Sequence, residues 1–347
     1  MKKKTLIISP LIKDFDWATL FCDADIDYKV INLKNINRRS WQMILDTIKI
    51  KEDLTQYNVI ITIDYYIAAG LALKTLLSGG AQYQHIAWGF NKSRDSRIEQ
   101  SAIINALLTR AFRHCDLFCV HSSHEIELFH KRFAINREKI IFRHWASNLP
   151  AVVDNKTLRE KYSLPNEYFC SIGRNNRDHQ LFIDALRDLD TSGVVVAPPE
   201  QIRQLSSSDN VQLLSNLPMD ETLGIINGSL ANILAIKDAS RGAGHMTAVF
   251  AMQMKKPQIV TRVDTIKEYF IEGEHGLSYE RGDLAGLKNC LRTLLSDNVA
   301  RETFGDKAYH FSQKWLTKKS VDQSLKELII NSSNNQTISQ MPKNWEY

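Results

Sequence analysis

The sequence predicts an α/β protein built from two doubly wound parallel sheets. Short apolar runs alternate along the chain with stretches of helical spacing, which is the pattern of parallel strands covered by helices on both faces. The alternation lapses near 148–155, where Pro150 and a polar Asp-Asn-Lys run favour a linker, and then restarts. The chain has 347 residues, which is more than a domain with a single hydrophobic core ordinarily contains. Two successive domains that face a cleft are therefore expected.

The first half contains runs with the length and composition of buried strands. They are Thr5–Ser9, Tyr28–Leu33, Val59–Asp64, Gln84–Trp88, Leu117–His121 and Lys139–Phe142. Helical spacing occurs between these runs, at Trp17–Ala24, Ser40–Lys49, Ile67–Leu77, Ile98–Phe112 and Glu125–Phe133. Residues 1–150 are therefore expected to form the first domain.

The second half repeats this organisation. Strands are expected at Glu167–Ile172, Gly193–Ala197, Val211–Leu214, Ala231–Ile236 and Pro257–Thr261. Helices are expected at Arg177–Leu186, Pro199–Leu205, Asp220–Asn227, His245–Met254, Ile266–Phe270 and Leu284–Leu295. Residues 156–308 are expected to form the second domain, and residues 331–347, rich in Ser, Asn and Gln, a flexible tail.

The composition excludes several classes of protein. No apolar run approaches the roughly 20 residues that span a bilayer, and the first apolar run meets Pro10 and then charge, unlike a signal peptide. Five scattered cysteines do not suggest a disulfide framework, so a cytoplasmic protein is expected. No motif indicates nucleic-acid binding.

The charge is uneven along the chain. Residues 1–150 carry 21 Lys and Arg against 15 Asp and Glu, and the remaining residues carry 23 against 24. The basic first half suits contact with an anionic membrane or an anionic acceptor, and ordinary surface charge is the alternative.

A first candidate site follows the strand that ends at Ile172. A turn with Gly173, Arg174 and Arg177 separates this strand from a helix. The free N–H groups and dipole of a helix start attract anions, and guanidinium groups suit phosphate. Both arginines could equally be solvated turn residues.

A second candidate site follows the strand that ends near Ile236. Gly242 and Gly244 lack a Cβ and so allow close approach of the backbone to a ligand. The N–H groups of His245, Met246 and Thr247 would then face a diphosphate. The alternative is a glycine loop that only turns the chain. Both corners lie at the carboxyl ends of strands, which favours one shared phosphate-bearing ligand.

Together these motifs resemble the donor domain of nucleotide-sugar glycosyltransferases of the GT-B architecture, with two Rossmann-like domains, and in particular the retaining family 4-like group. The resemblance rests on Gly173-Arg174 with Arg177-Asp178, on Gly244–Thr247 with Ala251-Met252 and Lys256-Pro257, and on the later Tyr269, Gly273, Gly276 and Gly282-Asp283. It covers about 167–330 well and covers the first half, the acceptor side, by layout. In this architecture the last helix, at 309–330, commonly crosses back to the first domain.

The resemblance implies a donor site that needs no metal and no cofactor. Gly173, Arg174, Arg177 and Asp178 would hold the donor with the turn Gly244, His245, Met246 and Thr247, while Leu214 would line the base; UDP or GDP is the expected nucleotide. The sequence departs from the family where many members carry two glutamates, because Gly242 and Phe250 occupy those positions. Asp238 is a candidate for part of the donor-sugar role.

The acceptor side offers several candidates at strand ends. Asp64, His85, Asp95 and His121 are each a possible catalytic base, and His85 is singled out because a Gly-containing loop follows it. A structural role is the alternative for each of them.

Two functions of different class follow from these observations. The first is a glycosyltransferase that moves a sugar from a nucleoside-diphosphate sugar to a glycan or lipid-linked acceptor, in surface polysaccharide synthesis at the inner face of the plasma membrane. The second is a catalytically silent nucleotide-sugar binder that partners another transferase. A GT-B-type sugar epimerase is a further possibility, although it would need more carboxylates in the cleft.

Overall fold

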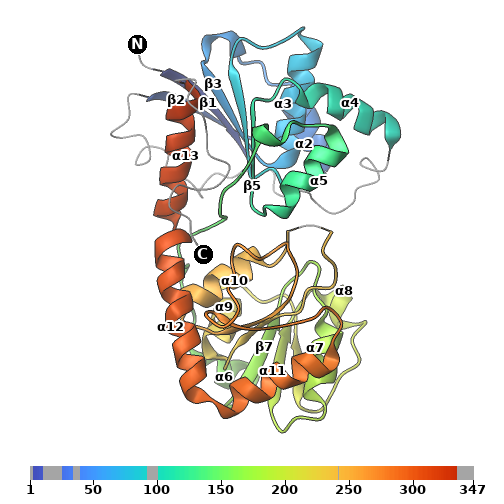
Figure 1. The fold of residues 1–347 in the computed structure, drawn as a ribbon, viewed down its shortest axis with the longest axis vertical. Helices are drawn as coiled ribbons and strands as arrows, with labels where there is room; N and C mark the ends of the chain where they lie inside the picture. Colours follow the sequence, from blue (N-terminus) through green and yellow to red (C-terminus); the bar gives the residue numbers. More distant parts are fainter. Residues whose placement is uncertain (1–2, 11–25, 34–39, 92–100, 241, 334–347) are drawn as a thin grey trace. The chain divides into compact units, whose positions relative to one another are not determined.

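The structure is a computed structural model that describes residues 3–10, 26–33, 40–91, 101–240 and 242–333. The chain divides into two compact units (Figure 1). Unit 1 comprises residues 1–144 and 321–347, and unit 2 comprises residues 145–320. The predicted helix Trp17–Ala24, the candidate Asp95 and the predicted tail from residue 334 lie outside the described residues.

Unit 1 contains a six-stranded parallel sheet in the order β2-β1-β3-β4-β5-β6. Its strands are β1 (Lys3–Ser9), β2 (Ile26–Asn32), β3 (Val59–Ile63), β4 (Gln84–Trp88), β5 (Leu117–Val120) and β6 (Ile140–Phe142). The central strands β3, β4 and β5 are buried along nearly their whole length because helices cover the sheet. The strand order reverses between β1 and β3, and this change of direction defines where a ligand crevice opens in such a sheet.

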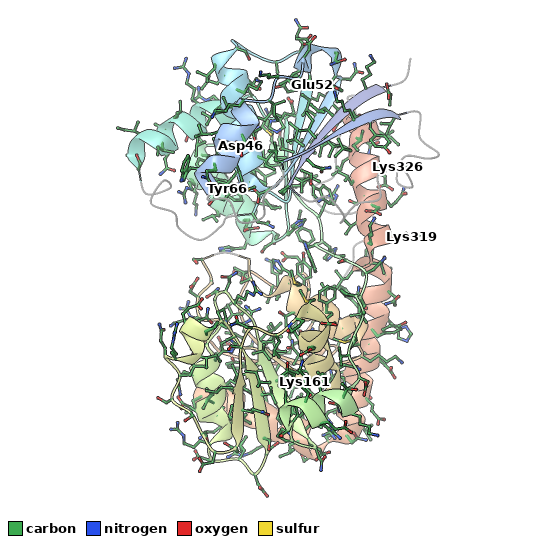
Figure 2. All side chains as sticks on the ribbon, turned by 180° about the vertical axis from the view of Figure 1, so that it is seen from behind. Asp46, Glu52, Tyr66, Lys161, Lys319 and Lys326 are labelled. Carbon is green, nitrogen blue, oxygen red and sulfur yellow. The ribbon has the colours of Figure 1, made fainter. Side chains whose placement is uncertain are left out.

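The helices of unit 1 pack on an aromatic core. They are α2 (Ser40–Ile48), α3 (Tyr65–Leu77), α4 (Ala102–Phe112) and α5 (His124–Phe133), with single 3₁₀ turns at Leu54–Gln56 and Arg137–Lys139. The rings of Tyr65, Phe90 and Phe112 contact one another with centroids 4.9 to 6.1 Å apart. Tyr66, which follows Tyr65 at the start of α3, is labelled in Figure 2 and belongs to the same core.

Unit 2 contains a second six-stranded parallel sheet, in the order β12-β11-β10-β7-β8-β9. Its strands are β7 (Tyr168–Ile172), β8 (Ser192–Val196), β9 (Val211–Leu214), β10 (Asn232–Leu234), β11 (Gln258–Thr261) and β12 (Gly276–Tyr279). The predicted class of two doubly wound parallel sheets is therefore confirmed. In this sheet the direction of strand succession reverses between β7 and β10.

Most helices of unit 2 begin at an aspartate cap or at proline. They are α6 (Asn155–Tyr162), α7 (His179–Leu186), α8 (Pro199–Ile202), α9 (Met219–Gly228), α10 (His245–Gln253), α11 (Leu284–Ser296) and α12 (Asn298–Trp315). Asp154, Asp283 and Asp297 each accept a hydrogen bond from a backbone N–H in the first turn of the helix that follows. Lys161 on α6 (Figure 2) forms an ion pair of 2.7 Å with Glu221 on α9.

The last helix, α13 (Lys318–Ser333), starts in unit 2 and continues in unit 1. Within unit 1 it buries Leu325, Leu328 and Ile329. Trp315 ends α12, and a short bend separates it from α13. No helix in the described part of the chain combines the length and the apolar character needed to cross a bilayer.

One predicted element of unit 2 is wrong. Residues 266–270 form turns and not a helix. In a helix the carbonyl of Thr265 would accept from the N–H of Tyr269, but here it contacts the ring of His245, and the N–H of Tyr269 donates to Ile266 instead. Neither β12 nor α6 was predicted, and the single helix expected at 309–330 is two helices, α12 and α13.

Candidate functional site

The candidate site lies at the carboxyl ends of β7 and β10, where the strand order of unit 2 reverses. In open α/β sheets a crevice forms at such a point because the two connections leave toward opposite faces of the sheet. One connection, residues 173–178, leads from β7 to α7. The other, residues 235–244, leads from β10 to α10. The structure thus places both predicted corners at the same switch point.

The first corner folds back on itself through Arg177. Gly173 has a φ of +150°, and a Cβ built on it would lie 2.8 Å from Arg177 Nε, so only glycine leaves room for this side chain. Arg177 donates from Nε to the carbonyl of Ile172 at 3.2 Å and from Nη1 to the carbonyl of Asn175 at 2.9 Å. The loop's own carbonyls therefore fix the direction of the guanidinium group.

Asn176 joins the first corner to the second. Its Nδ2 donates to the carbonyl of Asp238 at 2.7 Å, and its Oδ1 accepts from the N–H of Asp238 at 3.0 Å. Its φ of +56° lies in the left-handed region, which asparagine tolerates better than most residues. This contact was not predicted, although an Asn-Asn pair in a turn is a signal for such a conformation.

These contacts bring the two corners within reach of each other. The Nη2 atom of Arg177 lies 3.4 Å from the position that a Cβ on Gly244 would occupy. Gly244 has a φ of +96° and is the N-cap residue of α10. The guanidinium group and the start of a nine-residue helix therefore converge on one point, and both carry positive potential there.

The side chain of His245 holds the start of α10 in place. Its Nε2 lies 3.0 Å from the carbonyl of Thr265, and its ring stacks on that of Tyr269 with centroids 4.3 Å apart. The hydroxyl of Tyr269 in turn accepts from the backbone N–H of Trp145 at 2.6 Å. The His245 side chain thus positions the helix, while the first N–H groups of α10, those of His245, Met246 and Thr247, lack carbonyl partners inside the helix by its geometry.

Three of the predicted residues, Arg174, Leu214 and Met246, lie at the same edge of the sheet. Arg174 is exposed, and its backbone carbonyl accepts from the side chain of Gln201 on α8. Leu214 is half-buried at the end of β9, two strands from β7. Met246 is 46% exposed at the start of α10.

The structure corrects the predicted role of Asp178. This residue is the N-cap of α7, and its Oδ1 accepts from the N–H of Leu181 at 3.1 Å. Because its carboxylate neutralises the start of a different helix, it does not serve the anion site directly. Asp238 is exposed, and its Oδ1 accepts from the N–H of Ser240 at 2.9 Å, so its role toward a donor sugar stays a prediction.

The structure also contradicts His85 as a catalytic base. It is the second residue of β4, near the amino end of the strand, and is fully buried. Its Nε2 lies 2.9 Å from Thr62 Oγ1, and burial lowers its pKa to about 3. A base for an acceptor hydroxyl needs access to that hydroxyl, which a side chain enclosed in the sheet does not have.

Two other candidates do lie at the carboxyl edge of the unit 1 sheet. Asp64 directly follows β3, beside the β1–β3 switch point, and burial raises its pKa to about 6. His121 directly follows β5, and its Nδ1 lies 2.8 Å from the carbonyl of Arg143. Burial lowers the pKa of His121 to about 4, so the ring is neutral at pH 7.

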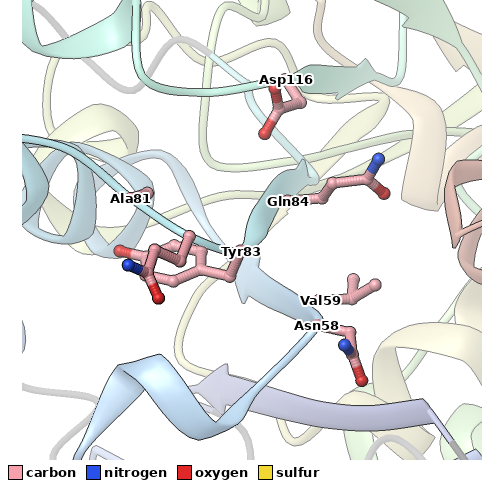
Figure 3. Close-up of a pocket in the computed structure, with 7 residues that line it drawn as sticks. Asn58, Val59, Ala81, Tyr83, Gln84 and Asp116 are labelled. Carbon is pink, nitrogen blue, oxygen red and sulfur yellow. The ribbon is translucent and has the colours of Figure 1, made fainter.

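A shallow pocket of about 420 Å³ opens at the opposite edge of the unit 1 sheet (Figure 3). It lies at the amino ends of β3 and β4 and is lined mainly by polar side chains, among them Asn58, Gln84 and Asp116. Asp116 Oδ2 accepts from the backbone N–H of His85 at 2.8 Å, so this carboxylate has a structural role. Ligand sites in such folds lie at carboxyl edges, and the pocket is therefore not part of the candidate site.

Comparison with known proteins supports the motifs of the second unit. Residues 155–311 match the model of the family described as glycosyl transferases group 1. Over 147 residues the chain is 27% identical to an uncharacterised glycosyltransferase of Methanocaldococcus jannaschii, and this match spans 41% of each protein. The chain thus spans less than half the length of that curated relative. The resemblance to glycosyltransferases drawn from the sequence motifs is confirmed by these matches, and the retaining family 4-like group stays a prediction.

The fold as a whole is shared with solved structures. HepE of Anabaena in complex with UDP superposes with a TM-score of 0.69 at 15% identity, over 94% of this chain and 100% of that one. Sucrose-phosphate synthase from Thermosynechococcus elongatus gives a TM-score of 0.72 at 14% identity, over 96% of this chain and 100% of that one. A glycosyltransferase from Rickettsia africae gives a TM-score of 0.66 at 15% identity, over 96% and 99%. At such identities the likeness establishes the fold.

Proposed function

We propose that this chain, whose residues 155–311 form a group 1 glycosyltransferase domain within a GT-B fold, transfers a sugar from a nucleoside-diphosphate sugar to a glycan or lipid-linked acceptor. The observation that carries the proposal is the convergence of the Arg177 guanidinium and the start of α10 at the β7–β10 switch point. Gly173 leaves room for the Arg177 side chain, and a guanidinium group beside the start of a helix suits a diphosphate. UDP is the favoured nucleotide because structures of Anabaena HepE hold UDP and UDP-glucose.

In this reaction the site has to stabilise the leaving group, which is the nucleoside diphosphate. The bond between the anomeric carbon and the diphosphate oxygen breaks, and its electron pair goes to the diphosphate. The acceptor oxygen forms the new bond to the anomeric carbon, and its proton passes to the departing diphosphate. Arg174, Arg177 and the N–H groups of α10 would offset the charge that grows on the diphosphate, and this is the largest task in such a reaction. Neither a metal nor a cofactor is required by this scheme.

The setting proposed for this reaction is the synthesis of surface polysaccharides at the inner face of the plasma membrane. It is supported by the excess of basic residues in the first 150 positions and by the family to which the second unit belongs. A protein in this setting would take its acceptor from the lipid surface and its donor from the cytoplasm.

A second candidate function is a silent nucleotide-sugar binder that partners another transferase. Two glutamates found in many family members are Gly242 and Phe250 here. Phe250 is buried, and its ring contacts that of Trp145 with centroids 5.9 Å apart, so the position belongs to the core. A binder would retain the diphosphate site and lack transfer.

Calorimetric titration with UDP, GDP and ADP tests the proposed site. We expect one of these nucleotides to bind the wild-type chain, and Arg174→Ala to raise its Kd by about tenfold because a charge-assisted contact is lost. Arg292→Ala, which removes an exposed arginine from α11, should leave the Kd unchanged. If none of the three nucleotides binds, or if the two variants behave alike, the proposed site is wrong.

Release of the nucleotide distinguishes the two candidate functions. The purified chain is incubated with a panel of UDP- and GDP-sugars, and free UDP or GDP is measured with and without alkyl glycosides as acceptors. A transferase releases nucleotide through slow hydrolysis or transfer, and Arg174→Ala lowers that rate. Binding of the nucleotide without any release would favour the silent partner.

A further inference from the structure

Helix α4 exposes large apolar side chains on the surface of unit 1. Ile103 is 82% exposed and Leu107 is 46% exposed, one helical turn apart. Ala102 and Ala106 are exposed beside them. With 3.6 residues per turn these four residues share one side of the first two turns of the helix, and together they form an apolar stripe.

The opposite side of α4 is also apolar. Leu108, Ala111 and Phe112 are buried in the aromatic core of unit 1, and Ile104 packs against the same core. A helix on the surface of a globular protein normally presents polar residues outward, and a helix that is apolar all round is normally enclosed. Because α4 lies at the outer side of unit 1, against α3 and α5 (Figure 1), its outward stripe calls for a partner.

The charged side chains at the C-terminal end of the stripe are all positive. Arg110 and Arg113 are exposed on the same side of the helix, in and just after its last turn. Helix α4 carries no acidic residue, and neither arginine forms an ion pair with any described residue. Arg132 of α5 adds another cation nearby, since its Nη2 donates to Asn105 Oδ1 on α4 at 3.2 Å.

The stripe lies on the functional side of unit 1. Helix α4 leads into the amino end of β5, so the start of the helix, with Ile103, is at the carboxyl edge of the sheet. Asp64 and His121 lie at this same edge. A surface on which Ile103 inserted would therefore be near the part of unit 1 that is proposed to receive the acceptor.

We propose that the outer side of α4, formed by Ile103, Ala106, Leu107, Arg110 and Arg113, binds the surface of an anionic membrane. Ile103 and Leu107 enter the boundary between headgroups and acyl chains, and the two arginines contact lipid phosphates. The inference rests on the proposed function in one respect, because it assumes that the acceptor is presented by a lipid surface.

The size of the stripe favours a membrane over a second copy of the chain. Eleven residues of helix extend roughly 17 Å, and two large apolar side chains cover far less than the roughly 800 Å² that each partner buries in a stable protein interface. A membrane needs no matched surface, and it combines a small apolar insertion with attraction between opposite charges. Binding should therefore be reversible and sensitive to salt.

Co-sedimentation of the full chain with vesicles tests this inference. The vesicles are phosphatidylcholine alone and phosphatidylcholine mixed with phosphatidylglycerol. We expect binding to the mixed vesicles only, weakened by salt, and reduced about tenfold or more in the double variant Ile103→Glu, Leu107→Glu. The variant Val299→Glu is the matched control, because Val299 is 72% exposed on α12 in unit 2 and should not affect binding. Arg110→Gln with Arg113→Gln should weaken binding without changing the fold.

Several outcomes would overturn the inference. These are equal binding to both kinds of vesicle, no binding to either, or an equal effect of the α4 double variant and the Val299 control. A dimer in analytical ultracentrifugation that the α4 double variant dissociates, without vesicle binding, would assign the stripe to a second copy. UDP binding measured on the same variants separates this inference from the proposed function, because the α4 substitutions should leave it unchanged.

Discussion

Asp64 is held in a backbone conformation that side chains rarely adopt. Its φ is +98°, and it sits where β3 turns into α3. The carboxylate accepts from the N–H of Tyr66 at 2.7 Å, which caps α3 and offsets the cost of the unusual backbone. Burial nevertheless raises the pKa of this carboxyl to about 6, well above its ordinary value of 3.8.

The variant Asp64→Asn should stabilise the protein at alkaline pH. The folded state holds its proton up to about pH 6 and the unfolded state only to about pH 4, so the native carboxyl loses stability as pH rises between these values. Asparagine tolerates a positive φ and still caps a helix, but it carries no charge. The variant should thus gain up to about 3 kcal/mol over the wild type between pH 4 and pH 8. Urea unfolding at pH 4 and at pH 8 measures the difference in stability between the variant and the wild type. An equal difference at both pH values would contradict the raised pKa of Asp64.

Residue types and their order predicted that two corners of unit 2 meet. Gly173, Arg177 and Gly244 do meet at one point, because glycine and arginine at strand ends report local backbone geometry directly. The contacts of Asn176 and the cap made by Asp178 depend on which loops become neighbours, and a single sequence does not contain that information. His85 was misplaced because its position within β4 decides its exposure.

At the scale of elements, α10 connects the candidate site to the segments that link the two units. Its first residue contacts Thr265, and its last residue, Gln253, donates from Nε2 to the carbonyls of Ser147 and Leu316, both at 2.9 Å. Ser147 lies just after the chain leaves unit 1, and Leu316 lies just before it returns. The amide group of Gln253 therefore hydrogen-bonds both segments that connect the two units.

Replacement of Gln253 by methionine should destabilise unit 2. The change keeps the side-chain length but removes both donors, which leaves two carbonyls unsatisfied at a position that is 9% exposed. At about 1 kcal/mol or more for each hydrogen bond, we expect a loss of about 2 to 3 kcal/mol in the free energy of unfolding. Gln313→Met, at an exposed position on α12, is the control and should change little. A similar loss of unfolding free energy in both variants would show that the hydrogen bonds of Gln253 do not stabilise these segments.

Element positions followed from the sequence wherever a strand was apolar and several residues long. Strands β4 and β9 have the bounds that the apolar runs predict. The four-residue β12 was missed because it begins with Gly276, whose absent Cβ would lie 1.8 Å from the carbonyl oxygen of Gln258. Its place in the sheet depends on this close approach to β11 and not on an apolar pattern.

At the scale of the whole molecule, both units bury neutral histidines. His85 and His121 are buried in unit 1, and His179 and His275 in unit 2. Burial lowers the pKa of His85 to about 3 and that of the other three to about 4. The ordinary value of 6.5 applies once the chain unfolds, so the unfolded state binds more protons between these limits.

The protein should therefore lose stability steadily as pH falls from 7 to 5, because stability rises with pH wherever the unfolded state holds more protons. Each buried histidine contributes up to about 1.4 kcal/mol per pH unit. Asp64 has the opposite effect, because the folded state holds its proton to a higher pH than the unfolded state does.

His179→Gln should reduce the pH dependence of the stability of unit 2, since glutamine retains a polar group near Ser171 Oγ and Gly173 but takes up no proton. His310→Gln, at an exposed position on α12, is the matched control. The measurement is urea unfolding of the three proteins at pH 7 and pH 5. A wild-type stability that is flat over this range, or an equal slope for His179→Gln, would show that these histidines are already accessible to protons in the folded state.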